Sequence, residues 1–280
     1  MRSFWLAMLL CVGLALPVHA ATVFSEDYEV GTLAALTARD WNIINPCIVY
    51  CTTQLVSTTR MGFSPHGGSK MLLQEYRGVH TAFQDANNSG IDRTFSGKQE
   101  IWVRYYMRYE AVDPAQPSGF SSITAKTHYF KSNTCVQFLT IHFFGRRQMD
   151  MGSNCLVQFP DQNIYHNMNL KPVQIGSIDG LWHCSEYHIK LDTAGANDGI
   201  LEMWLDGSQT HGFYNVNYTS AAAGNDNTRL TSLQIYRQGS DNLLRYEDDM
   251  VMSDSARVGC TGTPAQDTTN PNPPTNLTVQ

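Results

Sequence analysis

Residues 180–191 read GLWHCSEYHIKL, and residues 199–207 read GILEMWLDG. Each run alternates between two sets of side chains, as expected for a strand whose successive residues point to opposite faces. A polar turn that ends in Asn197-Asp198-Gly199 separates the runs, and an Asp206-Gly207 pair closes the second one. Asp-Gly is a strong signal for a tight turn, because both of its positions tolerate positive φ. We therefore expect a strand, a polar turn, a second strand and a tight turn in this order.

The same two-residue period recurs along the chain. At residues 101–109 an apolar and aromatic set alternates with Trp102, Arg104, Tyr106 and Arg108. Further alternating runs cover residues 123–130, 136–144, 230–237 and 245–252. No segment sustains an apolar stripe with the period of about 3.6 residues that marks a helix. Many short strands separated by Gly, Asn, Asp and Pro predict an all-β domain built as a two-sheet antiparallel sandwich.

The two ends of the chain differ in character from this domain. Residues 1–20 contain Arg2, an apolar stretch and the small-x-small pattern Val18-His19-Ala20, which together predict a secretory signal peptide. Residues 21–260 form the expected domain. Residues 261–280 are rich in Thr, Pro and Asn and are expected to be a linker or tail, whose last residues resemble the opening strand of a fibronectin type III module. The expected location is outside the cytoplasm, either extracellular or periplasmic.

The cysteines support an oxidising compartment. Removal of residues 1–20 takes away Cys11 and leaves an even number, at positions 47, 51, 135, 155, 184 and 260. An even set in an exported chain indicates disulfides, although many pairings are open. We expect 47 with 51, 135 with 155, and 184 with 260. Zinc is the alternative, but the close pair at 47 and 51 has no second close pair to complete a tetrahedral site.

The charge balance limits the possible partners. The formal net charge is -6, and only 16% of the residues are charged. Such a chain has no basic field to attract phosphates, so we expect no nucleic-acid partner. The apolar stretch at residues 4–16 is shorter than the ~20 residues of a membrane-spanning helix, and no second such stretch follows. We therefore expect no membrane insertion.

Three stretches resemble the concanavalin A-like jelly roll of secreted polysaccharide lyases, glycanases and sugar-binding proteins. They are FSEDYEVG at residues 24–31, the run at residues 180–207, and RYEDDMV at residues 245–251. The resemblance is to the group around heparin lyase I and glucuronan lyase, and the three stretches span nearly the whole domain. It implies a jelly-roll fold and a polysaccharide substrate or ligand. Because jelly rolls include both catalytic and purely binding proteins, it says less about activity than about fold.

The resemblance implies β-elimination on a uronic-acid polysaccharide. This reaction needs a group that neutralises the sugar carboxylate, a base for the C5 proton and an acid for the leaving oxygen, roles suited to Arg, Lys, His and Tyr. The candidate catalytic residues are Arg104, Lys126, His128, His142 and Tyr236. Thr140-Ile141-His142 resembles the Gln-Ile-His motif of one alginate lyase group, which implies that His142 is the catalytic imidazole. Thr140 stands where that motif has Gln, and the Tyr-x-Lys-x-Gly run of that group is absent.

Each candidate also has a structural interpretation. Lys126 and His128 are two residues apart, so a regular strand places both on one face, which is either a groove or a solvated outer face. His142 is followed by two phenylalanines and also fits an interior position. Arg104 fits a cation–aromatic contact with the neighbouring Trp102. Tyr236 shares a face with Gln234, opposite the face of Leu233 and Ile235, and also fits an ordinary core tyrosine.

Two further chemistries remain open. Hydrolysis would need Glu186 and Glu202 on one face of adjacent strands, and the Glu-x-Asp-x-x-Glu run of laminarinase-like jelly rolls is absent. No cofactor is required by the expected reaction. Glu29, Asp248 and Asp249 resemble the structural calcium ligands of carbohydrate-binding jelly rolls, which implies a stabilising ion.

Three functions are therefore compatible with the sequence. The first is an exported lyase for a uronic-acid polysaccharide. The second is a non-catalytic glycan-binding module in which aromatic side chains such as Trp102, Tyr106, Tyr129 and Tyr236 stack on sugar rings. The third is a structural adhesion domain whose groove is filled by its own side chains.

Overall fold

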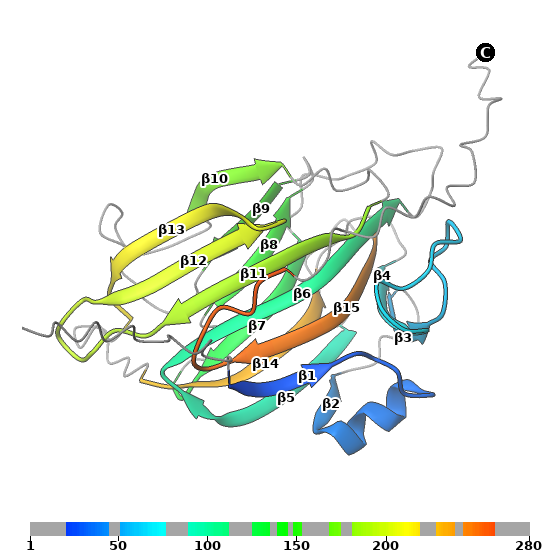
Figure 1. The fold of residues 1–280 in the computed structure, drawn as a ribbon, viewed down its shortest axis with the longest axis horizontal. Coiled ribbons are helices and arrows are strands. Elements are labelled where there is room, and N and C mark those ends of the chain that lie inside the picture. The colour runs from blue at the N-terminus through cyan, green and yellow to red at the C-terminus, as the bar shows by residue number, and fades with distance from the viewer. Residues whose placement is uncertain are drawn as a thin grey trace, which may run out of the picture.

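Two antiparallel sheets lie face to face in the described part of the chain (Figure 1). The computed structural model describes residues 21–44, 51–76, 89–111, 125–134, 139–144, 148–152, 168–174, 181–218, 228–238 and 243–260. Within these ranges the sheets have eight and seven strands. The expectation of an all-β, two-sheet antiparallel sandwich is confirmed. The expected signal peptide at residues 1–20 and the expected tail at residues 261–280 lie outside the described residues.

The strands follow a different order in space than in sequence. The eight-stranded sheet contains, in spatial order, β13 (Ser208–Val216), β12 (Gly199–Leu205), β11 (His183–Lys190), β6 (Glu100–Ala111), β15 (Leu243–Ser253), β4 (Met71–Tyr76) and β3 (Cys51–Val56), with β1 (Thr22–Glu26) also paired to β15. The seven-stranded sheet contains, in spatial order, β10 (Met168–Gln174), β9 (Gln148–Gly152), β8 (Leu139–Phe144), β7 (Ala125–Ser132), β14 (Leu230–Gln238), β5 (Ser89–Lys98) and β2 (Trp41–Ile44).

The hairpin expected from the sequence is present. β11 and β12 pair antiparallel, with Glu186 opposite Trp204 and His188 opposite Glu202. β12 then turns into β13 through Asp206 and Gly207, whose φ angles are 50° and 81°. Positive φ at both central positions is the requirement of the tight hairpin turn that an Asp-Gly pair favours. Asp206 also ties the turn to β11, because its carboxylate accepts a hydrogen bond from the Cys184 backbone N–H at 2.9 Å.

The opening and closing strands of the domain meet in the eight-stranded sheet. β1 pairs with β15, with Phe24 opposite Met252 and Glu26 opposite Met250. β15 in turn lies between β6 and β4. The first and last strands of the described domain are therefore joined near the middle of one sheet.

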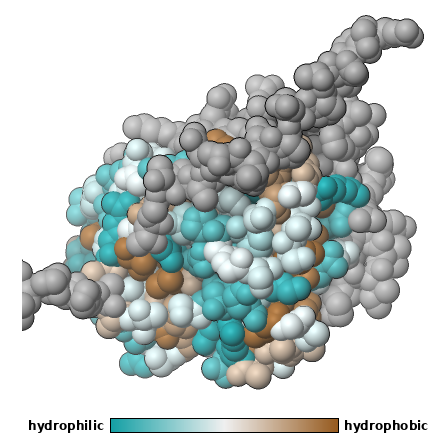
Figure 2. All heavy atoms as spheres, turned by 45° about the vertical axis from the view of Figure 1, so that its right-hand side comes forward, coloured by the Kyte–Doolittle hydropathy of each residue, from teal (hydrophilic) through white to brown (hydrophobic). Residues whose placement is uncertain are grey.

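The main hydrophobic core lies between the two sheets. It combines Val103 of β6 and Ile189 of β11 with Leu233 and Ile235 of β14 and Phe130 of β7, all of them buried. Full burial of each such side chain contributes about 1.5–3 kcal/mol. The alternation seen in the sequence therefore separates these inward-facing residues from the outer faces of the sheets. On the surface that Figure 2 shows, hydrophilic residues are mixed with scattered hydrophobic ones.

The outer face of the eight-stranded sheet is also partly covered. Residues 57–70, here called the covering loop, contact this face through Arg60 and His66. Residues 254–260, here called the C-terminal strap, contact it through Arg257 and Cys260. A second hydrophobic cluster results, made of Met71, Leu73, Tyr106, Trp182, Cys184, Leu244 and Tyr246 with Cys260 and Val56 packed against it. Because of this covering, the central positions of β11 are buried on both faces.

The described residues contain one helical segment, the 3-10 helix η1 (Leu33–Arg39). Thr32 caps its start by accepting a hydrogen bond from the Ala35 backbone N–H, and Asp40 ends it in the left-handed conformation at φ 65°. Leu36 anchors it in the core. Within the described ranges no helix combines the length and hydropathy that a membrane crossing requires.

Candidate functional site

Lys126 and His142 lie opposite each other on adjacent strands of the seven-stranded sheet. Lys126 of β7 pairs with His142 of β8, and His142 pairs with Asp150 of β9. On the other side of β7, Lys126 pairs with Gln238 of β14. Directly opposed positions in an antiparallel pair have Cα atoms about 4.5–5.5 Å apart. The sheet thus brings two of the five sequence candidates into one row of paired residues, here called the Lys126 row: Gln238, Lys126, His142 and Asp150.

The expectation that Lys126 and His128 share a face rests on a regular strand, and β7 is irregular between these two residues. The register of β7 against β8 shifts between these two residues, because Lys126 pairs with His142 whereas His128 pairs with Ile141. Two steps along β7 therefore match one step along β8, which is the arrangement of a β-bulge. Counting every second residue assumes a regular strand, and the extra residue Thr127 breaks that count.

His128 lies between the sheets rather than on an open face. Its side chain is 1% exposed, and its Nε2 lies 3.2 Å from the carboxylate of Glu247 on β15. The ring also packs against Tyr105 of β6, with the centroids 4.4 Å apart. Burial lowers the pKa of His128 below its usual 6.5, even though the negative charge of Glu247 acts in the opposite direction. The sequence interpretation of an open-face imidazole does not describe this environment.

Glu247 belongs to a polar group enclosed between the sheets. Arg245 Nε lies 3.0 Å from Glu247 Oε1, and Arg245 also donates to Gln74 of β4. Gln74 in turn donates to the Ile235 carbonyl of β14 at 3.1 Å. Burial alone would raise the pKa of Glu247, but the positive charge of Arg245 and the contact with His128 hold it below its usual value. The group therefore contains a carboxylate and a guanidinium that neutralise each other and join the two sheets.

Tyr236 and Arg104 occupy different sheets. Tyr236 follows Ile235 on β14, one strand away from Lys126, and its backbone pairs with Gly90 of β5. Arg104 lies on β6 in the eight-stranded sheet, is 7% exposed, and donates through Nη2 to the Asp249 carbonyl at 3.2 Å. Its guanidinium lies 5.2 Å from the ring centroid of Tyr106. The cation–aromatic contact of Arg104 is thus with Tyr106, whereas Trp102 was the expected partner, and Arg104 lies in the other sheet from the Lys126 row.

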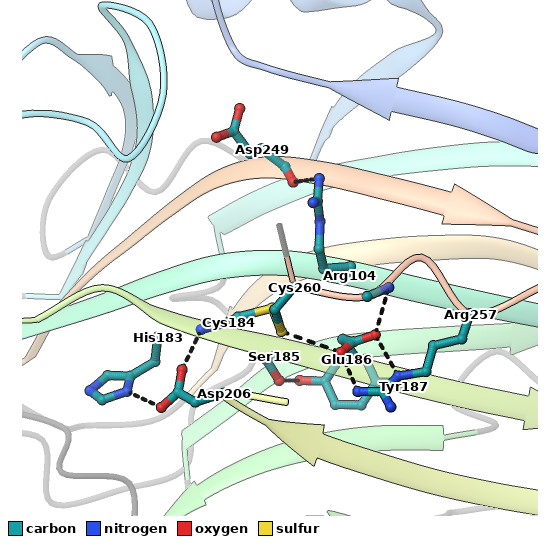
Figure 3. The surroundings of a disulfide bond; sticks show 11 residues. Arg104, His183, Cys184, Ser185, Glu186, Tyr187, Asp206, Asp249, Arg257 and Cys260 are labelled. Atoms are coloured by element: carbon teal, nitrogen blue, oxygen red, sulfur yellow. Dashed lines mark hydrogen bonds and ion pairs between the residues drawn. A yellow bond between two sulfur atoms is a disulfide. The ribbon is translucent and has the colours of Figure 1, made fainter. Parts of the chain in front are cut away.

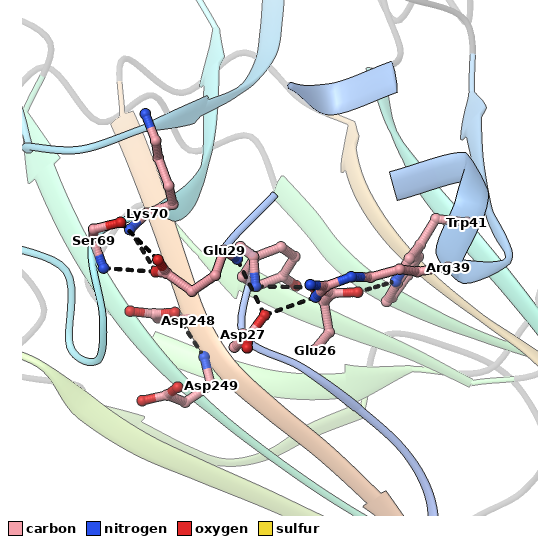
Figure 4. Close-up of polar contacts among 10 residues, drawn as sticks. Glu26, Asp27, Glu29, Arg39, Trp41, Ser69, Lys70, Asp248 and Asp249 are labelled. Carbon is pink, nitrogen blue, oxygen red and sulfur yellow. Dashed lines mark hydrogen bonds and ion pairs between the residues drawn. The ribbon is translucent and has the colours of Figure 1, made fainter. Parts of the chain in front are cut away.

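The three residues expected to bind calcium surround residues 66–70 of the covering loop (Figure 4). Glu29 accepts hydrogen bonds from the backbone N–H groups of Ser69 and Lys70, at 2.6 and 2.7 Å, and from the Ser69 hydroxyl at 2.6 Å. A Cβ atom on Gly68 would lie only 2.3 Å from Glu29 Oε1, so this close approach requires glycine.

Asp248 and Asp249 bind the same loop from β15. Asp248 accepts from the Gly67 backbone N–H at 3.0 Å, and Asp249 Oδ2 lies 2.7 Å from His66 Nδ1. Burial and the neighbouring Asp249 charge raise the pKa of Asp248 to about 8, although the hydrogen bond from Gly67 acts against this rise. His66 stacks on Tyr106 with the ring centroids 3.4 Å apart, which fixes the loop against β6.

Glu29, Asp248 and Asp249 offer the type of ligand that a hard cation prefers, but their oxygen atoms are not arranged around a common point. Three carboxylates are the ligand type that calcium prefers. Their oxygens, however, bind loop donors and do not converge: among the described residues, the cluster whose ligand atoms lie within 4.8 Å of one another is Cys184, Glu186 and Cys260. That cluster is not a metal site as it stands, because both sulfur atoms form a disulfide.

The Cys184–Cys260 disulfide fastens the C-terminal strap to β11 (Figure 3). This confirms one of the three expected pairs. For the other two pairs, Cys47, Cys135 and Cys155 lie outside the described residues. Next to the disulfide, Arg257 makes two hydrogen bonds to the Glu186 carboxylate, at 2.9 and 2.6 Å.

Glu186 and Glu202 do share the outer face of the eight-stranded sheet, as hydrolysis would require. Glu186 is only 2% exposed and is occupied by Arg257 and by the Gly259 backbone N–H. Glu202 accepts from Tyr214, Gln209 and His188. Both carboxylates thus have internal partners, and the strap lies over one of them.

Comparison with solved structures finds the same fold in three polysaccharide lyases. A glucuronan lyase from the fungus Trichoderma reesei matches with 16% identity and a TM-score of 0.55, over 84% of this chain and 96% of its own. A variant of the alginate lyase Aly36B, in complex with alginate trisaccharide, matches with 16% identity and a TM-score of 0.57, over 85% and 100%. The marine PL-14 alginate lyase from Aplysia kurodai matches with 14% identity and a TM-score of 0.55, over 84% and 100%.

This chain has the jelly-roll fold of these lyases. The match covers nearly the full length of each of them, so it concerns the whole domain rather than one motif. No protein-family model matches the chain, and no curated protein matches it in sequence. The resemblance drawn from residues 24–31, 180–207 and 245–251 is confirmed at the level of the fold.

Proposed function

We propose that the protein is a polysaccharide lyase that cleaves a uronic-acid polysaccharide by β-elimination. The observation that carries this proposal is the domain-wide match to a glucuronan lyase and two alginate lyases. The opposed positions of Lys126 and His142 on β7 and β8 add to it, because a cationic group and an imidazole are two of the groups that the reaction requires.

The roles follow from the chemistry of each group. In the proposal His142 removes the C5 proton, Lys126 neutralises the sugar carboxylate, and Tyr236 on the neighbouring β14 protonates the leaving oxygen. Arg104 and His128 are left out, because Arg104 is buried in the other sheet and His128 is enclosed between the sheets. The reaction needs no cofactor.

Activity on a substrate panel tests the proposal. Purified protein is incubated with glucuronan, alginate and a glycosaminoglycan, and the ultraviolet absorbance of the unsaturated product is followed. We expect a signal with at least one of them. Lys126→Met and His142→Asn should each slow it by roughly a hundredfold or more, the usual contribution of an electrostatic stabiliser for Lys126 and of a general base for His142.

Lys131→Met is the matched control for Lys126→Met. Lys131 lies on the same strand, its side chain is 24% exposed, and it pairs with Asp92 at 3.4 Å. The control should retain the wild-type rate. Folded protein that binds one of these polysaccharides but releases no unsaturated product would instead identify a non-catalytic glycan-binding module.

We also propose that the protein is exported and that it carries a structural calcium ion. The signal-peptide pattern of residues 1–20 and the Cys184–Cys260 disulfide support export, because disulfides persist in oxidising compartments. The three carboxylates of Glu29, Asp248 and Asp249 around one loop support calcium, which would require their oxygens to turn from the loop donors toward a common ion.

A further inference from the structure

One end of the outer face of the eight-stranded sheet carries an exposed aromatic ring. The C-terminal strap lies over Glu186 and Trp204, where Arg257 is 4.3 Å from the Trp204 ring centroid. The neighbouring row contains Glu202, His188 and Trp102, paired across β12, β11 and β6. Beside it on β13 stands Tyr214, which is 51% exposed. We call Tyr214, Gln209, Glu202, His188 and Trp102 the Tyr214 face.

The Tyr214 ring is held in place over a glycine. Its hydroxyl donates to Glu202 Oε1 at 2.6 Å, and Gln209 Nε2 donates to the same oxygen at 3.0 Å. A Cβ atom on Gly212, which pairs with Glu202, would lie 2.9 Å from Gln209 Nε2 and 3.5 Å from Tyr214 Cε2. Because Gly212 has no side chain, the side chains of Tyr214 and Gln209 can pass over it and reach the Glu202 carboxylate. Tyr214 as a whole nevertheless remains 51% exposed.

The remaining groups of the face are fixed by the same network. Glu202 Oε2 lies 2.7 Å from His188 Nδ1, and His188 Nε2 lies 2.8 Å from Glu100 Oε1. The His188 ring stacks on Trp102, with the centroids 3.5 Å apart and the planes 5° apart. Because these side chains are already ordered, little of their conformational entropy is lost when a ligand binds here.

The chemistry of the face matches a neutral sugar chain. An exposed aromatic ring stacks on the C–H face of a pyranose, and flanking carboxylate and amide groups form hydrogen bonds with its hydroxyls. The Glu100 side chain is 40% exposed, and the nearby Lys190 lies 3.7 Å from Asp198, so it is paired with an acidic group of its own. Glu100 and Glu202 would repel a polyuronate. The charge of this face therefore disfavours the substrate class proposed for the Lys126 row.

We propose that the Tyr214 face is a second polysaccharide-binding site, which takes a neutral hexose polymer with one sugar ring stacked on Tyr214. The site lies on β13, β12, β11 and β6, whereas Lys126 and His142 belong to the seven-stranded sheet. Binding at this face does not require the lyase reaction, so the two proposals can fail separately.

Affinity electrophoresis tests the site. The protein is run through native gels that contain hydroxyethyl cellulose, laminarin, galactomannan or, separately, alginate. We expect retardation by at least one neutral polymer. Tyr214→Ala should weaken that binding on the order of tenfold, the effect of losing one aromatic stacking contact, and Tyr214→Trp should preserve it because the ring platform remains.

Met61→Ala is the matched control. Met61 is 48% exposed on the covering loop, away from β13, and its replacement should leave retardation unchanged. Circular dichroism establishes that each variant is folded, and unchanged migration of Tyr214→Ala in alginate gels separates this face from the Lys126 row. The proposal is overturned if no neutral polymer retards the wild type, if Tyr214→Ala binds as tightly as the wild type, or if Tyr214→Trp loses as much affinity as Tyr214→Ala.

Discussion

His128 makes the stability of the sandwich depend on pH. Burial lowers its pKa below 6.5, so the unfolded chain takes up a proton at a higher pH than the folded protein does. Stability from this residue is therefore complete above about pH 6.5 and declines as the pH falls toward the lower folded value. Glu247 acts in the same direction at lower pH, because its folded pKa is also lowered. We expect the melting temperature to fall on acidification from pH 6.5.

His128→Gln separates the two contributions. The amide can still donate to Glu247 but does not titrate, so the decline that begins at pH 6.5 should shrink while the decline at more acidic pH remains. Melting curves of both proteins between about pH 3 and pH 8 provide the measurement, since Glu247 titrates below its usual 4.5. Parallel pH profiles for the two proteins would contradict the assigned role of His128.

The burial of a single residue could be predicted from the sequence where it depends only on the alternation within the residue's own strand. Leu233 and Ile235 were expected to share the face opposite Gln234, and both are fully buried in the core. The same reasoning failed at His128, whose orientation depends on the register shift beside Thr127. A bulge is set by pairing with two neighbouring strands, and a period counted along one strand does not contain that information.

Among the elements, the C-terminal strap illustrates how a short segment without regular secondary structure stabilises a sheet. Arg257 pairs with Glu186, Lys98 pairs with Asp254 at 2.6 Å, and Cys260 is bonded to Cys184. The disulfide joins residues 76 positions apart, so its loss frees a long loop in the unfolded chain. We expect Cys260→Ser to lower the free energy of unfolding by about 2–4 kcal/mol, measured by urea denaturation.

Hydrogen exchange distinguishes the strap from a general loss of stability. In Cys260→Ser, amides of residues 254–260 should exchange faster than in the wild type, and this change should exceed that of the amides of β14, which belongs to the other sheet. Lys190→Met is the control, since it removes a surface pair at 3.7 Å and should change stability by less than about 1 kcal/mol. Equal protection of the strap in wild type and Cys260→Ser would show that the disulfide does not hold it.

The elements that sequence reasoning identified are those with strong alternation. All seven runs quoted for their two-residue period contain or overlap a strand, including β6, β7, β8 and β15. The helix η1 was not expected, because seven residues are too few to display a helical period and its cap, Thr32, is a common surface residue. The burial of β11 on both faces could not be predicted from the sequence either, because it depends on segments that are distant in the sequence.

For the whole molecule, the decisive feature is that β1 and β15 join the two ends of the domain. Glu29 follows β1, and Asp248 and Asp249 lie on β15, so both ends hold the covering loop. An ion bound by these three residues would link the first strand, the last strand and the loop at once. Because a ligand that binds only the folded state stabilises it by mass action, calcium should raise the melting temperature of the entire domain.

The size of this effect follows from the affinity. Calcium at about a hundred times its dissociation constant would add about 2.7 kcal/mol, and a chelator would remove it. Glu29→Gln and Asp249→Asn should each abolish the response to calcium, whereas Asp27→Asn, a nearby acid that pairs with Arg39 at 2.7 Å, should leave it intact. If calcium and chelator give the same melting temperature for the wild type, the carboxylates serve only as hydrogen-bond acceptors for residues 66–70. In that case the closure of the sandwich would depend on protein contacts alone.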